Sequence, residues 1–181
     1  MLRRLVPAAL LFSLGCSEGS PGAPAVLTDA RGWENATLES DPFAAFRAGR
    51  LVCPGSSWNP DSDGVEIHTQ SCNYATLTQG AAAPVSVGDP ITVELRWQTL
   101  ASAESATAQV AMAFGQAVVF EETVPIPAQA DVRQVRFDSP VALRAGDPLY
   151  IHVRNHGWNA WHFGVMRREP DPINNQEKRP Q

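Results

Sequence analysis

Lysine is nearly absent from this chain of 181 residues: Lys178 is the only one among 14 basic residues. Charged residues make up 18% of the chain, against about 25% in an average soluble domain, and the net charge is −5. Nucleic-acid binding is therefore not expected, because it requires a basic face. The sequence also lacks HExxH, CxxC and GxSxG motifs, so the common zinc-protease, redox and hydrolase signatures are missing. The length suits one domain, and 44% apolar residues can build its core.

The N-terminus carries a targeting pattern. Arg3 and Arg4 precede an apolar run of ten residues, Leu5–Leu14, which is too short to span a bilayer but fits a secretory signal. The following Gly15-Cys16 junction resembles a bacterial lipobox, although Ser13 replaces the commoner leucine. The resemblance implies that Cys16 is lipidated and becomes the mature N-terminus. Ser17 after it is not a residue that retains lipoproteins in the inner membrane, so the resemblance also implies the outer membrane. The alternative is an ordinary cleaved signal. We therefore expect a membrane partner through the N-terminal lipid and a place in the cell envelope, on its periplasmic or surface face.

Composition divides the rest of the chain into segments. The Ser-, Gly- and Pro-rich stretch after Cys16 is typical of a flexible tether. Residues 25–50 are interpreted as an irregular arm that contains a short helix around Pro42–Ala48. Asp41 could cap the N-terminus of that helix. The expected segments are a signal peptide (1–15), a tether (16–26), an irregular arm and loop (27–64), a β-sandwich domain (65–168) and a disordered tail (169–181).

Two cysteines remain once Cys16 is set aside. Cys53 and Cys72 form an even pair, which in an oxidising compartment favours a disulfide. Such a bond would close a loop of about 20 residues and contribute on the order of 3 kcal/mol. Two free core thiols are the alternative.

From Val65 onward, apolar and polar residues alternate with a period of two. The alternating segments start near Val65, Ile91, Ala108, Leu149 and Trp161 and are separated by Gly and Pro. This rhythm predicts an all-β fold, an antiparallel jelly-roll β-sandwich. The order of the strands over 65–168 resembles the galactose-binding-like jelly roll of many carbohydrate-binding modules, which implies carbohydrate as the leading ligand class. The strings Ser71-Cys72-Asn73-Tyr74, Val124-Pro125-Ile126-Pro127 and 154–161 resemble uncharacterised myxobacterial-type lipoproteins, a resemblance that brings no activity.

The segment Tyr150–Phe163 is the richest in side chains that bind ligands. Trp, Asn and His together can stack on sugars and hydrogen-bond to them, and the candidate binding residues are Tyr150, His152, Asn155, His156, Trp158 and Asn159. Two other interpretations stay open: a metal site built on His152, His156 and His162 with a distant carboxylate from Glu66, Glu94 or Glu122, or a turn whose tryptophans plug the end of the sandwich. Exposure of Trp158 and Trp161 distinguishes a stacking platform from a plug.

The path of the chain through this segment decides whether its histidines meet. In a hairpin centred on Gly157, His152 would face His162 across the two strands. In a jelly roll, the loop Asn155–Ala160 crosses between the sheets and they never meet; we expect this crossing. In either case Leu149, Ile151, Val153, Trp161, Phe163 and Val165 should be buried.

The segment Asn59–Gly64 resembles the first half of a calcium-binding EF-hand loop. Its second half fails, because Glu66 and Gln70 stand where an apolar residue and a glutamate are required. A calcium site completed by ligands from elsewhere in the chain stays open, and a plain Asp-Gly turn entering a strand is the simpler interpretation.

The sequence thus predicts a lipid-anchored envelope protein that binds, most simply, a glycan, without catalysis, cofactor or metal. One alternative is a structural lipoprotein that binds another envelope protein through a sheet edge or face. The other is a small metal-dependent enzyme using His152, His156 and His162.

Overall fold

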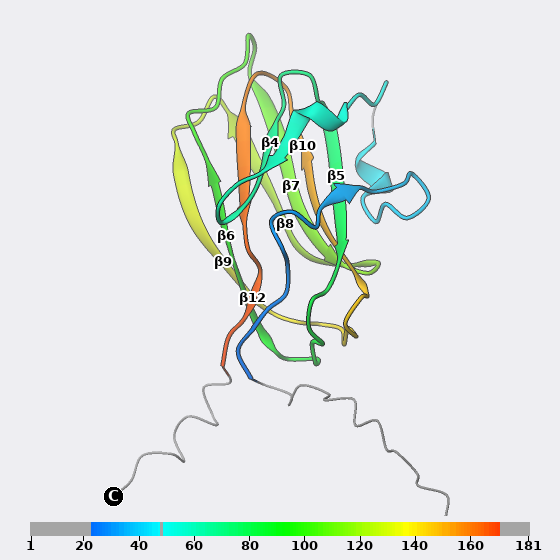
Figure 1. The fold of residues 1–181 in the computed structure, drawn as a ribbon. Helices are drawn as coiled ribbons and strands as arrows, with labels where there is room; N and C mark the ends of the chain where they lie inside the picture. Colours follow the sequence, from blue (N-terminus) through cyan, green and yellow to red (C-terminus); the bar gives the residue numbers. More distant parts are fainter. Residues whose placement is uncertain (1–22, 48, 171–181) are drawn as a thin grey trace, which may run out of the picture.

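The computed structural model describes residues 23–47 and 49–170, and they form two antiparallel sheets packed face to face (Figure 1). The first sheet contains β1 (Ala25–Val26), β3 (Trp58–Pro60), β4 (Gly64–His68), β6 (Pro90–Trp97), β9 (Asp131–Asp138), β11 (Ala160–Gly164) and β12 (Arg167–Arg168). The second contains β2 (Glu34–Asn35), β5 (Tyr74–Gly80), β7 (Ala106–Phe114), β8 (Ala117–Ile126) and β10 (Pro148–Arg154). Two short 3-10 helices, η1 (Ala44–Phe46) and η2 (Gly55–Ser57), lie in the N-terminal arm.

The eight long strands follow the jelly-roll order. The order β4-β11-β6-β9 in one sheet faces β5-β10-β7-β8 in the other, so most successive strands alternate between the sheets, which is how a double-sheet jelly roll is wound. Of these eight strands, only β7 and β8 follow each other within a sheet, through the tight turn at Gly115, whose φ is 57°. The all-β, antiparallel jelly-roll sandwich predicted from the alternation is therefore confirmed.

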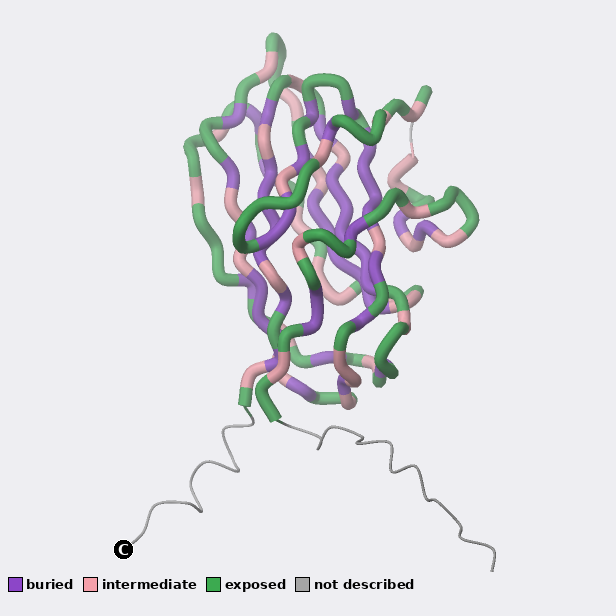
Figure 2. The backbone as a smooth tube through the Cα atoms, viewed as in Figure 1, coloured by how far each residue is buried: buried purple, intermediate pink, exposed green. Residues whose placement is uncertain are grey.

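The core lies between the sheets, where buried segments gather in Figure 2. Of the residues expected inside, all but one are buried: Leu149, Ile151, Val153, Trp161 and Phe163 are each 0% exposed. Val165 is only half-buried, so that expectation was wrong. The reason is that β11 ends at Gly164. The N–H of Val165 instead donates a hydrogen bond of 2.8 Å to the carbonyl oxygen of Asp63.

The chain crosses between the sheets after β10, as expected. Because β10 belongs to one sheet and β11 to the other, and Ile151 and Phe163 point inward, His152 and His162 lie on opposite outer faces of the sandwich. The alternative hairpin, with the two histidines in contact, is excluded.

The arm packs against the outer face of the second sheet. Phe43 is 1% exposed and its ring stacks on His152, 4.8 Å between centroids, while the Asp41 carboxylate accepts hydrogen bonds from the Phe43 N–H and the Tyr74 hydroxyl. The short helix expected around Pro42–Ala48 is the single turn η1. This cover explains why residues on the outer face of β10 are buried as deeply as those of the core.

A disulfide joins Cys53 to Cys72, confirming the predicted pair. It fastens the segment before β3 to the start of β5. At the other end of the chain, Glu169 accepts a hydrogen bond from Thr92 Oγ1 at 2.6 Å. The expected signal peptide, Cys16 and residues 171–181 of the expected tail lie outside the described residues. Within the described part, no helix has the length and apolar character needed to cross a membrane.

Candidate functional site

Three loops gather at one end of the sandwich. They join β4 to β5 (69–73), β6 to β7 (98–105) and β10 to β11 (155–159), and Figure 1 shows them at the top, while the blue and red ends of the coloured ribbon lie at the bottom. The predicted ligand-binding segment supplies the third loop. Its exposed side chains therefore project from the end of the molecule that is farthest from both described chain ends.

The six candidate residues separate into three groups. His156 and Trp158 are exposed at the loop end, whereas Asn155 and Asn159 are 1% and 6% exposed beneath it. Tyr150 and His152 are 3% and 0% exposed and lie along β10, under the arm. Their burial corrects the sequence interpretation for these two residues, because a ligand at the loop end has no access to them.

Buried polar groups hold the third loop in place. Thr69 Oγ1 lies 3.0 Å from the carbonyl oxygen of Asn159 and accepts the Asn159 N–H at 3.2 Å, and Asn155 Nδ2 also donates to this hydroxyl. Asn159 Nδ2 donates in turn to Asn155 Oδ1 at 3.3 Å. Since buried polar groups are costly to leave unpaired, this network fixes the loop from below and binds it to the β4–β5 loop.

Gly157 brings the third loop close to the β6–β7 loop. Its φ is +102°, a backbone conformation that residues with a side chain rarely adopt. A Cβ at this position would lie 2.3 Å from the carbonyl oxygen of Ala101. The Ala101 N–H donates to Asn159 Oδ1 at 2.8 Å across the same contact. A glycine is therefore required here by both conformation and space.

Trp158 stands on top of this arrangement with 77% of its surface exposed. It borders three depressions, of about 830, 340 and 250 Å³, so the indole forms a ridge between them. Trp161 differs: it is 0% exposed and packs against Trp97 in the core, with 5.3 Å between the ring centroids. The exposure of Trp158 suits a platform on which a ligand could stack, whereas the burial of Trp161 assigns it to the core.

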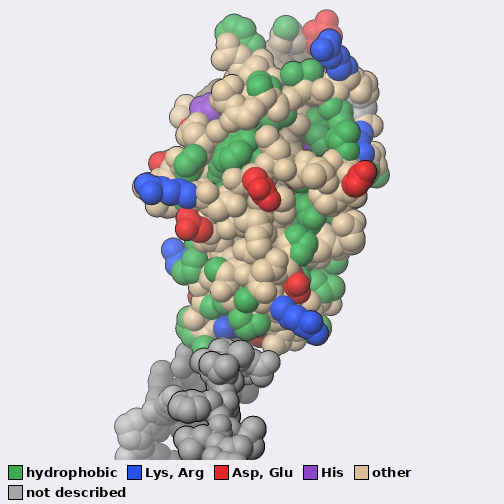
Figure 3. Space-filling view, turned by 45° about the vertical axis from the view of Figure 1, so that its right-hand side comes forward, with side chains coloured by type: hydrophobic (Ala, Val, Ile, Leu, Met, Phe, Trp, Pro, Cys, Tyr) green, Lys and Arg blue, Asp and Glu red, His purple; other side chains and the backbone are tan. Residues whose placement is uncertain are grey.

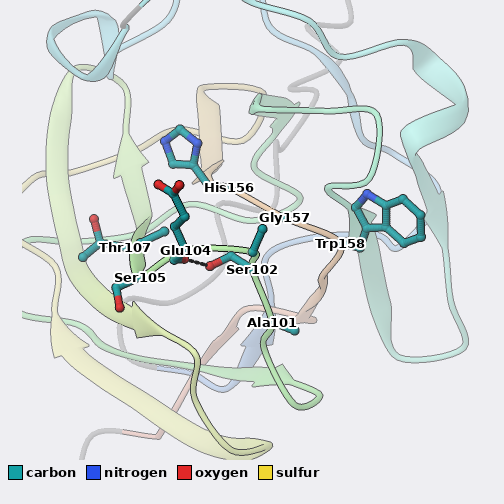
Figure 4. Close-up of a pocket in the computed structure, with 10 residues that line it drawn as sticks. Ala101, Ser102, Glu104, Ser105, Thr107, His156, Gly157 and Trp158 are labelled. Carbon is teal, nitrogen blue, oxygen red and sulfur yellow. Dashed lines mark hydrogen bonds between the residues drawn. The ribbon is translucent and has the colours of Figure 1, made fainter.

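The largest depression has polar groups on one side. Ser102, Glu104, Thr107 and His156 line it, and Figure 4 shows the Glu104 carboxylate directed toward the His156 ring, while the Trp158 indole points away from both. Among the described residues that line the three depressions, Glu104 is the only carboxylate. Residues 102–107 also line this depression and were not among the residues predicted to bind a ligand. In the sequence, only the Ser and Glu residues among the alanines of 101–108 could have indicated them.

His152 belongs to a separate, buried cluster. Burial lowers its pKa to about 3, and burial together with the neighbouring Asp41 raises the pKa of Tyr74 to about 12. Burial alone would raise the pKa of Asp41, but hydrogen bonds from Tyr74, the Phe43 N–H and Arg47 outweigh it and hold that pKa below its usual 3.8. At neutral pH the imidazole is neutral, the phenol is protonated and the carboxyl is charged, which suits a structural support for the arm.

The proposed cluster of His152, His156 and His162 does not form. His156 is on the exposed loop, and the other two lie on opposite outer faces of the sandwich. His162 instead faces Asp61 and Asp63, at the turn where a calcium loop was considered and an Asp-Gly turn into β4 is found. The enzyme hypothesis built on three adjacent histidines is therefore wrong in its geometry.

Charge is dispersed over the surface visible in Figure 3, where acidic and basic side chains are interspersed and no broad basic area is seen. This agrees with the low count of basic residues.

Comparisons with known proteins give only distant structural likenesses. No description of a protein family matches the sequence, and no curated protein matches it. Among solved structures, the N-terminal cellulose-binding domain of β-1,4-glucanase C from Cellulomonas fimi is 8% identical, covering 84% of this chain and 99% of that chain with a TM-score of 0.46. A mutant of a family 29 carbohydrate-binding module is 10% identical, covering 81% of this chain and 90% of that chain with a TM-score of 0.44. The Agl-KA catalytic domain is 12% identical over 60% of this chain, with a TM-score of 0.38, and the match spans only 22% of that chain. Sequence identities and TM-scores this low give no basis for assigning a ligand or a role to this chain.

Proposed function

We propose that the protein is a non-catalytic carbohydrate-binding protein of the cell envelope, with Trp158 as its stacking platform. The observation that carries this proposal is a tryptophan that is 77% exposed at the tip of a loop whose own neighbours are buried and hydrogen-bonded. Leaving most of an indole in water forgoes about 3–5 kcal/mol of burial free energy. A rigid loop that keeps it exposed favours a ligand that covers it.

The chemistry around Trp158 suits a sugar. One face of a pyranose ring presents C–H groups that pack on an aromatic ring, and its hydroxyls require donors and acceptors at the edges. His156, Glu104 and Ser102 offer these on one side of the ridge, and Gln70 and Gln98 line the depressions on the other. An oligosaccharide lying across the ridge would place one residue on Trp158 and its neighbours in the flanking depressions.

Two features support binding without catalysis. Glycoside hydrolysis requires two carboxylates that flank the scissile bond, and the described lining of the loop end supplies Glu104 alone. The loop is also pre-ordered by Thr69, Asn155 and Asn159, which lowers the entropic cost of binding.

The lipid anchor on Cys16 belongs to the same proposal and rests on the N-terminal sequence. The loop end faces away from the end of the sandwich where Ala23 and Arg168 meet through a hydrogen bond of 2.6 Å. An anchor preceding residue 23 would therefore leave Trp158 on the side directed away from the membrane.

Binding another envelope protein through a sheet edge is less favoured. The long edge strand β9 exposes Val132, 63% accessible, but its neighbours Asp131 and Arg133 are charged and pair with each other at 2.8 Å. Charges on an edge strand oppose the addition of a further strand.

The test is a glycan array probed with the purified protein and with Trp158→Ala. We expect a restricted set of oligosaccharides to bind the wild type and to be lost with Trp158→Ala. Leu38→Ala is the matched control, because Leu38 is also exposed, 65% accessible, but lies in the arm. If the wild type binds no glycan, or if Trp158→Ala leaves the same spots unchanged, the proposal is wrong.

A further inference from the structure

Two aspartates and a histidine meet on the outer face of the first sheet, at a place that the proposed glycan site does not use. Asp61 and Asp63 lie in the turn between β3 and β4, and His162 lies on β11 next to β4. One ligand atom from each of the three lies within 4.8 Å of the other two. We propose that Asp61, Asp63 and His162 bind a divalent transition-metal ion of the Zn²⁺ class.

The buried histidine is the observation that separates this cluster from an ordinary acidic surface. His162 is 4% exposed, and neither ring nitrogen forms a hydrogen bond with any described residue. Its Nε2 nevertheless lies beside the carboxylates, 3.1 Å from Asp63 Oδ1 and 3.8 Å from Asp61 Oδ2. An unpaired buried nitrogen is costly, and a metal ion between these atoms would remove that cost for Nε2.

The separations suit a small ion. Bonds of about 2.0–2.2 Å at tetrahedral angles place neighbouring ligand atoms about 3.3–3.6 Å apart. The two measured separations, 3.1 and 3.8 Å, lie on either side of this range. Two carboxylates and one imidazole leave a fourth position for water, and the imidazole favours zinc, cobalt or nickel over calcium, which prefers six or more oxygen ligands.

The turn that carries the aspartates is held firmly against β11. The Asp61 N–H bonds the Gly64 carbonyl at 2.9 Å, and the Val165 N–H bonds the Asp63 carbonyl at 2.8 Å. Gly64 packs so closely that a Cβ would lie 2.0 Å from the carbonyl oxygen of Phe163. The aspartates are therefore positioned beside His162 by backbone contacts, before any ion is present.

Arg96 is the competing cation. Its guanidinium lies 3.1 Å from Asp63 Oδ2 and 3.5 Å from Asp61 Oδ2, and it keeps the two carboxylates together without an ion. Burial and Arg96 also lower the pKa of His162, so its ring is neutral at pH 7 and has a lone pair to donate. Metal binding requires Arg96 to withdraw from the carboxylate oxygens, which its 35% exposed side chain can do by turning into solvent.

The experiment is isothermal titration of Zn²⁺ into the full chain carrying Cys16→Ser, since a Cys16 thiol that has not been lipidated would itself bind zinc. We expect one ion per chain and a rise in melting temperature on zinc addition. Asp63→Asn changes only an exposed side chain and keeps the backbone contacts of the turn. It should weaken binding by at least about tenfold, and His162→Gln should do the same. Arg96→Gln should strengthen it, because the competing charge is removed.

His68→Gln is the matched control. His68 lies on the same sheet and pairs with Glu66 at 3.2 Å, but it is outside the cluster. Zinc affinity that is unchanged in Asp63→Asn, or lost in His68→Gln, would overturn the proposal. So would the absence of zinc binding, or tighter binding of Ca²⁺ than of Zn²⁺. None of these results bears on glycan binding at Trp158, so the two proposals fail separately.

Discussion

The buried His152 makes the stability of the fold depend on pH in a way that can be calculated. Its pKa is lowered from 6.5 to about 3 by burial, whereas in the unfolded chain it titrates near 6.5. Between these values the unfolded chain binds a proton that the folded chain does not, so stability falls as the pH falls. The full slope of about 1.4 kcal/mol per pH unit applies only below pH 6.5, over roughly 1.5 units, so lowering the pH from 7 to 5 should cost about 2 kcal/mol through this residue. That is a large share of the 5–15 kcal/mol by which domains are usually stable.

The assay is urea unfolding of the wild type and His152→Phe at pH 7 and pH 5. Phenylalanine fits the aromatic surroundings, with Phe43 and Tyr74 within 4.8 and 4.6 Å between ring centroids, and it does not titrate. The loss of unfolding free energy between the two pH values should be about 2 kcal/mol smaller in the variant. His162, whose pKa is also lowered, is present in both proteins and cancels in the comparison.

Equal pH dependence in the two proteins would refute the reasoning. If the variant does not fold, NMR titration of the His152 ring in the wild type decides instead. A ring that titrates between pH 7 and 5 in the folded protein would show that the imidazole is not held neutral.

Three further predictions follow from local geometry and sequence. Gly157→Ala should destabilise the loop end by about 1–3 kcal/mol, because φ is +102° and the Cβ would meet the Ala101 carbonyl; chemical denaturation measures this, and a neutral effect would contradict it. Replacing Cys53 and Cys72 together by serine should cost about 3 kcal/mol for a bond spanning 19 positions, measured by unfolding with and without reductant, and an unchanged stability would contradict a role in anchoring the arm. Cys16→Ala should move the protein out of the membrane fraction or stop its processing, as followed by fatty-acid labelling; equal labelling of wild type and variant would exclude the anchor.

The alternation of side chains was sufficient to predict the sandwich. A period of two with Gly and Pro between segments specifies antiparallel strands. The string Gly-Asp-Pro precedes both β6 and β10, and at each place it forms a turn with a positive-φ glycine, Gly88 at 87° and Gly146 at 91°. The disulfide followed from counting cysteines. These features depend on residues near one another in the sequence or on a single unambiguous pairing.

The candidate site was predicted only in part, because its composition depends on long-range packing. Nothing near His152 in the sequence indicates that Phe43, over a hundred positions earlier, covers it. The meeting of His162 with Asp61 likewise depends on the register of β11 beside β4, which alternation alone does not specify. Trp158 was identified correctly as a loop-tip residue because Gly157 beside it marks a turn.

The most direct test of the account is the affinity of the best array oligosaccharide for the wild type, Trp158→Phe and Trp158→Ala, measured by titration calorimetry together with melting temperature. We expect Trp158→Ala to weaken binding by about tenfold or more, at least about 1.4 kcal/mol, with little change in melting temperature, because 77% of the indole is already in water. Trp158→Phe, which keeps an aromatic face, should bind with intermediate affinity. A large fall in melting temperature with unchanged affinity would contradict the account and assign Trp158 to the structure of the loop.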